Sequence, residues 1–149
     1  MARAPFDRYI GGEKGNIRMG SAVAHINLLA AWVGITIGFV WGFAMGLFFH
    51  RDEWLGGYGA LKRRLYRLAH ISLFGLALIN IAFFFTAEHL VFTSTALRVA
   101  SVGFLVGAIS MPICCVAMAH FPRRRELFLI PVLSLVIAGA CTLWEVWQR

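Results

Sequence analysis

The sequence predicts an all-α integral membrane protein, a bundle of four transmembrane helices. Of its 149 residues, 60% are hydrophobic and 14% are charged, which leaves too little polar surface to cover a soluble globule. Apolar runs close to the ~20 residues that cross ~30 Å of hydrocarbon occur four times. Because apolar and polar residues do not alternate with period two, a transmembrane barrel is rejected. We therefore expect one membrane domain over residues 1–149, with spans at 19–49, 68–87, 99–119 and 127–144.

The positive charge lies outside these spans. The net charge is +7, but the 14 Lys and Arg residues sit in connections and tails, or directly before a span, as expected for cations near lipid headgroups. No basic face is interleaved with aromatic residues, so we expect no nucleic-acid partner. Eight cations fall in the first and third connections: Arg51, Lys62, Arg63, Arg64, Arg67, Arg123, Arg124 and Arg125. This bias predicts that both termini lie on the non-cytoplasmic side. The membrane that we expect is a bacterial-type inner membrane.

Before the first span, residues 1–18 are polar and lack an apolar core, so we expect no signal peptide there. The span itself carries glycines at steps of four: Gly34, Gly38, Gly42 and Gly46. In lipid, such small residues let another helix approach closely. The third span carries Gly103 and Gly107 at the same step, so it is a candidate partner, as is a helix of a separate subunit.

Aromatic and basic residues mark the predicted membrane interfaces. The first connection leads into a basic segment with leucines at helical spacing, which predicts an amphipathic entry to the second span that lies among headgroups. Two tryptophans at the end of the fourth span predict an aromatic belt. The predicted interface residues are Trp54, Lys62, Arg63, Arg64, Trp144 and Trp147.

One amide side chain, Asn80, falls near the middle of the second span. An unpaired amide is costly in hydrocarbon. We therefore expect Asn80 to face a neighbouring helix and to find a hydrogen-bond partner there.

The histidines support a haem hypothesis. His70 and His120 each lie three residues inside an arginine, Arg67 and Arg123, so the two imidazoles have equal predicted depth on different helices. Two such imidazoles are typical axial ligands of a b-type haem, and arginines pair with its propionates. His50 lies on the same side of the membrane. The alternative is that these histidines are interfacial anchors.

A copper hypothesis uses the third span. The candidate ligands on this span are the sulfur atoms of Met111, Cys114, Cys115 and Met118 and the imidazole of His120. Sulfur ligands suit Cu(I). Met and Cys also pack well as apolar side chains, which is the competing interpretation.

The interpretation placed first is a non-catalytic or accessory transmembrane subunit of a larger, energy-transducing (respiratory or electron-transport) complex, docking through small-residue helix faces. A b-type haem electron-transfer protein with bis-His ligation is the alternative, and a Cu(I)-binding protein the lesser one. The sequence has no phosphate-binding glycine loop with a lysine, no HExxH and no paired carboxylates within a span, so we expect no catalytic activity of its own. The expected partners are the lipid bilayer and other membrane subunits; the cofactor is undetermined, with haem b the candidate.

Overall fold

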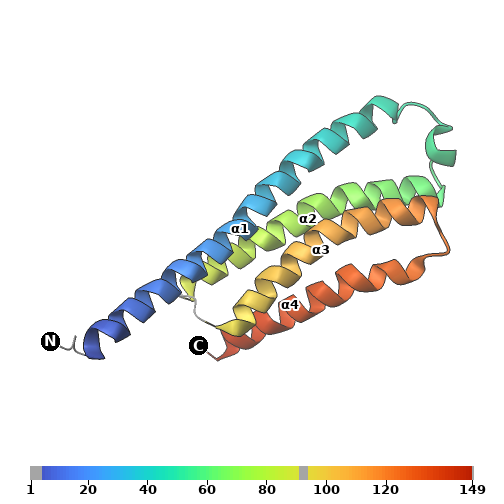
Figure 1. Ribbon diagram of the computed structural model, residues 1–149. Helices are drawn as coiled ribbons and strands as arrows, with labels where there is room; N and C mark the ends of the chain where they lie inside the picture. The colour runs from blue at the N-terminus through green and yellow to red at the C-terminus, as the bar shows by residue number, and fades with distance from the viewer. Residues whose placement is uncertain (1–4, 91–93, 149) are drawn as a thin grey trace.

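The computed structural model describes the backbone of residues 5–90 and 94–148, and side chains from residue 24 onward within those ranges. All regular structure in this part of the chain is helical (Figure 1). The long helices are α1 (Pro5–Phe48), α2 (Leu61–His89), α3 (Thr95–His120) and α4 (Leu129–Trp147). Two short 3₁₀ turns, η1 (Trp54–Gly56) and η2 (Arg125–Phe128), lie in the connections before α2 and α4.

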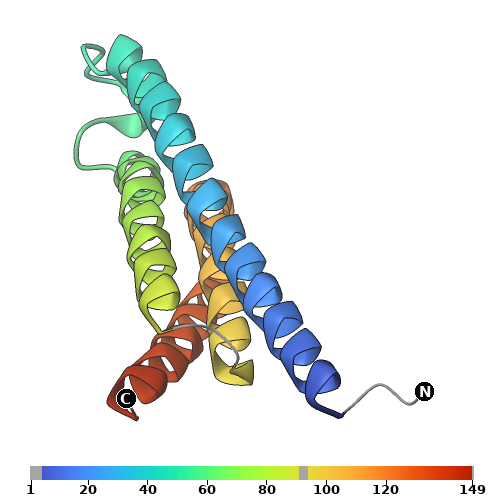
Figure 2. The same cartoon turned by 90° about the vertical axis from the view of Figure 1, so that its left-hand side faces the viewer.

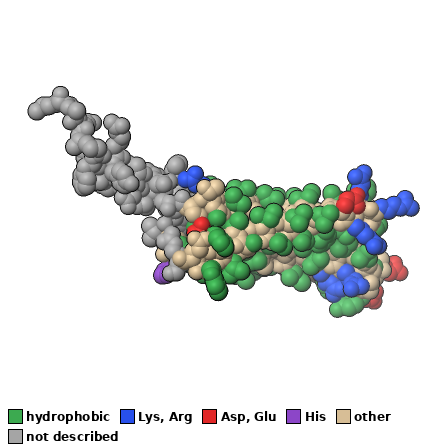
Figure 3. Space-filling view, turned by 90° about the horizontal axis from the view of Figure 1, so that it is seen from below, with side chains coloured by type: hydrophobic (Ala, Val, Ile, Leu, Met, Phe, Trp, Pro, Cys, Tyr) green, Lys and Arg blue, Asp and Glu red, His purple; other side chains and the backbone are tan. Residues whose placement is uncertain are grey.

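Four helical segments are long and apolar enough to cross a membrane, which confirms the predicted fold class of a multi-pass membrane protein. They are Ala24–Phe48, Leu61–His89, Thr95–His120 and Arg125–Trp147. The basic segment before the second predicted span belongs to α2 itself, which runs as one helix from Leu61. Hydrophobic side chains cover the middle of the face shown in Figure 3, and Lys and Arg gather at the end that holds the α1–α2 and α3–α4 connections.

The helices pack in chain order. α1 lies on α2, α2 on α3 and α3 on α4, while α1 touches α3 over a smaller area. Figures 1 and 2 show that α1 runs obliquely and that its C-terminal end leans away from the other helices. Helices α1 and α4 therefore form the two outer members of an open arrangement.

All four helices meet at the end of the molecule where α2 ends and α3 begins. The hydrophobic core there contains Phe83 and Ala87 of α2 and Leu97 and Phe104 of α3. Ala24 of α1 and Ala138 of α4 join the same cluster. The bundle is thus held together at one end and opens at the other, where α1 leans out.

Three glycines of the first span face neither of the candidate partners, the third span or a separate subunit, but α2 of the same chain. A Cβ atom placed at Gly34, Gly38 or Gly42 would meet α2, at 3.4 Å from the Leu73 carbonyl oxygen in the case of Gly34. Gly46 has no atom of another element within 4 Å.

The glycines of the third span face α4 instead. A Cβ at Gly103 would lie 2.8 Å from the Ser134 carbonyl oxygen, and one at Gly107 would lie 2.4 Å from Leu135. The three glycines of α1 and the two of α3 therefore each face a helix that is adjacent in the chain.

Candidate functional site

A buried polar cluster links three helices inside the membrane-spanning part. The Asn27 amide on α1 donates from Nδ2 to Asn80 Oδ1 on α2 over 2.8 Å, and to the Ser101 carbonyl oxygen on α3 over 3.3 Å. The Ser101 hydroxyl donates to Asn27 Oδ1, and Asn80 Nδ2 donates to the Leu76 carbonyl oxygen at 2.8 Å. All three side chains are at most 1% exposed. The prediction that Asn80 pairs with a neighbouring helix is confirmed.

Sequence reasoning missed Asn27 and Ser101, the other members of this cluster. A usable signal was present, because Asn27 and Asn80 are the two asparagines within the hydrophobic spans. Two amides that must each satisfy a donor and an acceptor in lipid are expected to find one another. The cluster contains amides and a hydroxyl without a titratable group, so its chemistry suits helix positioning rather than proton transfer.

The two candidate haem ligands have different neighbours. The Nε2 atom of His70 points at α1, where it would lie 2.7 Å from a Cβ at Gly42, and its ring packs edge-on against Phe74. The Nε2 atom of His120 lies 3.0 Å from the Tyr66 hydroxyl.

An axial pair needs both nitrogens free and aimed at one iron between them. His70 and His120 therefore do not fit the two axial positions of one haem. Of the other residues of that hypothesis, His50 and Arg123 are exposed, and Arg67 lies over the Tyr58 ring, 4.9 Å from its centroid.

The candidate copper ligands on α3 have different neighbours, η2 for Cys114 and Tyr66 of α2 for His120. Cys114 is buried and its thiol donates to the Leu127 carbonyl oxygen at 3.3 Å, while Cys115 is fully buried. Met111 and Met118 are half-buried, and all three cysteines are free thiols. Among the described residues, no three His, Cys, Asp or Glu side chains come together as metal ligands.

Arg63 organises the connection between α1 and α2, although the sequence predicts it among headgroups. That prediction is wrong, because the side chain is 3% exposed. Its Nη2 donates to the Phe49 carbonyl oxygen at 3.1 Å, just beyond the C-terminus of α1. Its guanidinium lies 4.6 Å from the centroid of Phe49, 5.6 Å from that of Trp54 and 5.3 Å from that of Tyr58. Attraction between the cation and these ring faces stabilises the connection.

The other predicted interface residues lie at the two ends of the spans. Lys62 is half-buried and Arg64 exposed in the first turn of α2, whereas Trp144 and Trp147 are exposed near the end of α4. Trp54 is half-buried and stacks on Phe48, with 6.1 Å between ring centroids.

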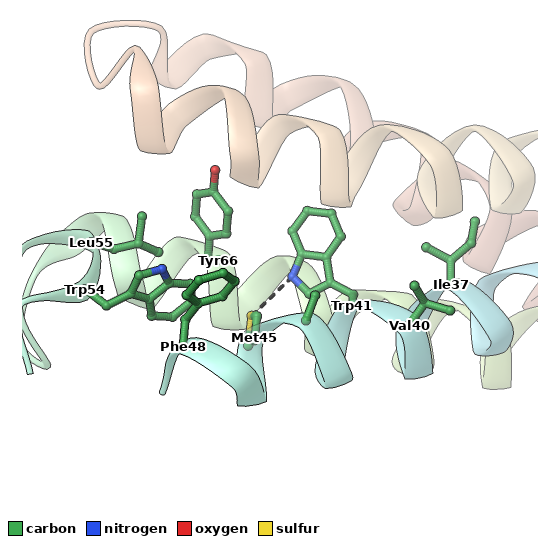
Figure 4. Close-up of a pocket in the computed structure, with 9 residues that line it drawn as sticks. Ile37, Val40, Trp41, Met45, Phe48, Trp54, Leu55 and Tyr66 are labelled. Carbon is green, nitrogen blue, oxygen red and sulfur yellow. Dashed lines mark hydrogen bonds between the residues drawn. The ribbon is translucent and has the colours of Figure 1, made fainter. Parts of the chain in front are cut away.

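A groove of about 440 Å³ opens beside the C-terminal half of α1. Figure 4 shows that α1, η1 and Tyr66 of α2 contribute its lining, and that the Trp41 indole nitrogen is directed at the Met45 sulfur. The lining residues are Ile37, Val40, Trp41, Ala44, Met45, Phe48, Trp54, Leu55 and Tyr66. It lies beside the contact of α1 with α2 at Gly38 and Gly42, and none of the candidate haem or copper ligands is among its lining residues.

In comparisons with known proteins, the chain matches no protein-family model, no curated protein and no solved structure.

Proposed function

We propose that this chain is a non-catalytic transmembrane subunit that docks onto a larger membrane complex through α1. The observation that carries the proposal is an exposed aromatic strip on that helix. Trp32, Phe39 and Phe43 are 58%, 67% and 71% exposed. Because they are separated by seven and four residues, at ~100° per residue they share one side of α1.

The position of this strip supports an interaction role. Trp32 and Phe43 lie on the side of α1 away from its contact with α2. Phe39 lies at the margin of that contact and packs edge-on against Phe74 of α2, with 5.2 Å between ring centroids. Large aromatic side chains are enriched at the centre of protein interfaces, because they bury much area with few rotatable bonds. The small-residue faces that the sequence suggested for docking are taken up within the chain at Gly34, Gly38 and Gly42.

The buried polar cluster also supports a scaffold role. Asn27, Asn80 and Ser101 satisfy one another and the backbone, which fixes α1 against α2 and α3 near the core end. A helix held rigidly at one end and exposed along its outer side is suited to presenting a docking surface.

Native mass spectrometry in a mild detergent tests the proposal. We expect the mass spectrum to show the chain in a discrete complex with at least one other membrane polypeptide, at a fixed stoichiometry. Phe43→Ala is expected to weaken this assembly, because it removes a large anchor from the strip. Phe85→Ala is the matched control, since Phe85 is 63% exposed on α2. A stable monomer extracted from native membranes without a stoichiometric partner would contradict the proposal.

The proposed class of complex is energy-transducing, respiratory or electron-transport, by analogy with small helical subunits that lack an extramembrane domain. An isolated complex without redox absorbance from any subunit would contradict this class. The proposed location is a bacterial-type inner membrane with both termini on the non-cytoplasmic side. A periplasm-sensitive reporter fused to the C-terminus tests that orientation, and a cytoplasmic signal would reverse it.

A further inference from the structure

We infer that the groove beside α1 binds one anionic phospholipid, with an acyl chain along the groove and the phosphate near Arg51. The lining from Ile37 to Phe48 lies on α1. At ~1.5 Å per residue this stretch is ~17 Å long, close to half of the ~30 Å hydrocarbon core. The groove thus has the length of one leaflet, and it ends at the connection that carries the basic residues.

The lining suits hydrocarbon. Eight of the nine side chains have no charge or hydroxyl, and the Tyr66 hydroxyl is engaged by His120 Nε2 at 3.0 Å. The Trp41 indole nitrogen donates to the Met45 sulfur at 3.2 Å. Trp54 lies at the connection end, the level at which indole rings face headgroups. A polar ligand would leave its own groups unpaired against most of this surface, whereas an acyl chain has none to satisfy.

The connection end of the groove is net basic, which favours an anionic headgroup: residues 51–67 hold five Lys or Arg side chains and two acidic ones, Asp52 and Glu53. Arg51 is exposed, and its guanidinium carbon lies 5.8 Å from the centroid of Phe48, a lining residue. Arg64 is exposed in the first turn of α2 at the same end of the molecule. Each such cation contributes about 1 kcal/mol to the attraction of an anionic lipid surface. The groove and the cations together match the two halves of an anionic phospholipid.

The length of the groove argues against a helix of another protein as its occupant. A transmembrane helix has a diameter of ~10 Å and crosses both leaflets. The groove lining on α1 is confined to residues 37–48, beside the contact that Gly38 and Gly42 make with α2. The groove is also separate from the aromatic strip proposed for docking. At ~100° per residue, Ile37, Trp41 and Ala44 lie on one side of the α1 face that contacts α2, and the aromatic strip lies on the other side of that face.

The test is a lipid titration of the delipidated full-length chain, followed by native mass spectrometry. Phosphatidylglycerol and phosphatidylcholine with identical acyl chains are the two probes. We expect one phosphatidylglycerol to bind at a concentration about fivefold lower than phosphatidylcholine, the factor that one arginine supplies. Equal binding of the two lipids would overturn the inference.

Variants separate the two halves of the site. Ala44→Trp fills the groove and is expected to abolish the bound lipid, while Ala140→Trp, at an exposed alanine of α4, leaves it bound. Arg51→Gln removes the charge of an exposed side chain and is expected to remove the preference for phosphatidylglycerol and to keep acyl-chain binding. Lipid retained by Ala44→Trp, or an unchanged preference in Arg51→Gln, would overturn the inference. Loss of a bound polypeptide from Ala44→Trp with lipid still bound would assign the groove to a protein.

Discussion

Asn27 on α1 and Asn80 on α2 form a buried hydrogen bond of 2.8 Å between their side-chain amides, inside segments that cross the membrane. Neither amide is exposed. Since the Asn27 oxygen also accepts from Ser101, this one pair joins α1, α2 and α3. The arrangement explains how α1 stays attached although much of its length faces outward.

We expect Asn80→Leu to lower the free energy of unfolding by about 2 kcal/mol, because it leaves the Asn27 amide without its partner in a buried site. Equilibrium unfolding in detergent micelles measures this loss. In a double-mutant cycle, Asn27→Ala and Asn80→Ala should couple by about 1 kcal/mol. Additive effects would show that the two amides do not stabilise the fold as a pair.

Two buried serines provide the control for that measurement. Ser101 donates to another helix, whereas Ser72 donates to the Ala69 carbonyl oxygen of its own helix at 2.7 Å. Ser101→Ala should therefore destabilise the bundle more than Ser72→Ala. Equal losses would indicate that burial, rather than the link between helices, determines the effect.

Gly103 allows α3 and α4 to touch, and we expect Gly103→Ala to destabilise this contact by about 1–2 kcal/mol. A Cβ there would lie 2.8 Å from the Ser134 carbonyl oxygen and 2.9 Å from Ala138 Cβ, so the backbone of α4 must move. Gly139→Ala is the control, because nothing lies within 4 Å of a Cβ at that position. It should be neutral or stabilise the chain by up to about 1 kcal/mol, the gain in helix propensity. Thermal unfolding distinguishes the two, and equal midpoints would contradict the prediction.

The number and approximate position of the spans follow from the sequence because a span must be long and apolar, and both properties are local. The helix starts do not, since α1 begins at Pro5 and α2 at Leu61, ahead of the predicted spans. The identity of the helix on which each span packs does not follow from the sequence. In lipid, the face that packs on a neighbour and the face that meets acyl chains are both apolar, so Gly42 and Gly103 indicate a close contact without naming the contacting helix. In this fold Gly42 faces α2 and Gly103 faces α4, each a helix adjacent in the chain.

Arg63 shows a second limit of the sequence. In a run of cations beside a span, composition does not distinguish a side chain in headgroups from one buried under a connection. The distinction arises from Phe49, Trp54 and Tyr58, which fold over Arg63 once the connection turns back at Gly56 and Gly57, both with positive φ. Helical spacing gave one clue, since Arg63 precedes His70 by seven residues and so shares its side of α2.

The Gly42 position accommodates the His70 ring, so we expect Gly42→Leu to destabilise the α1–α2 contact by about 2 kcal/mol. Adding His70→Ala removes the obstructing ring and should restore part of the loss. Gly46→Leu is the matched control on the same helix, because a Cβ there meets nothing within 4 Å. Unfolding in detergent measures all three variants. If Gly46→Leu is as damaging as Gly42→Leu, the cost reflects the loss of glycine itself and not the close approach of α2.

Arg63 stabilises the turn between the first two helices, and Arg63→Met should lower the free energy of unfolding by about 2 kcal/mol. The variant loses the charged hydrogen bond to the Phe49 carbonyl oxygen and the contacts with three aromatic rings, while the methionine retains most of the apolar volume. Arg64→Met removes the same charge from the neighbouring, exposed residue and should change stability by less than about 0.5 kcal/mol. Hydrogen exchange supplies a local measurement: the amides from Arg51 to Ala60 should exchange faster in Arg63→Met and remain unchanged in Arg64→Met. Equal effects of the two substitutions would mean that net charge near the headgroups, rather than the buried guanidinium, holds this connection in place.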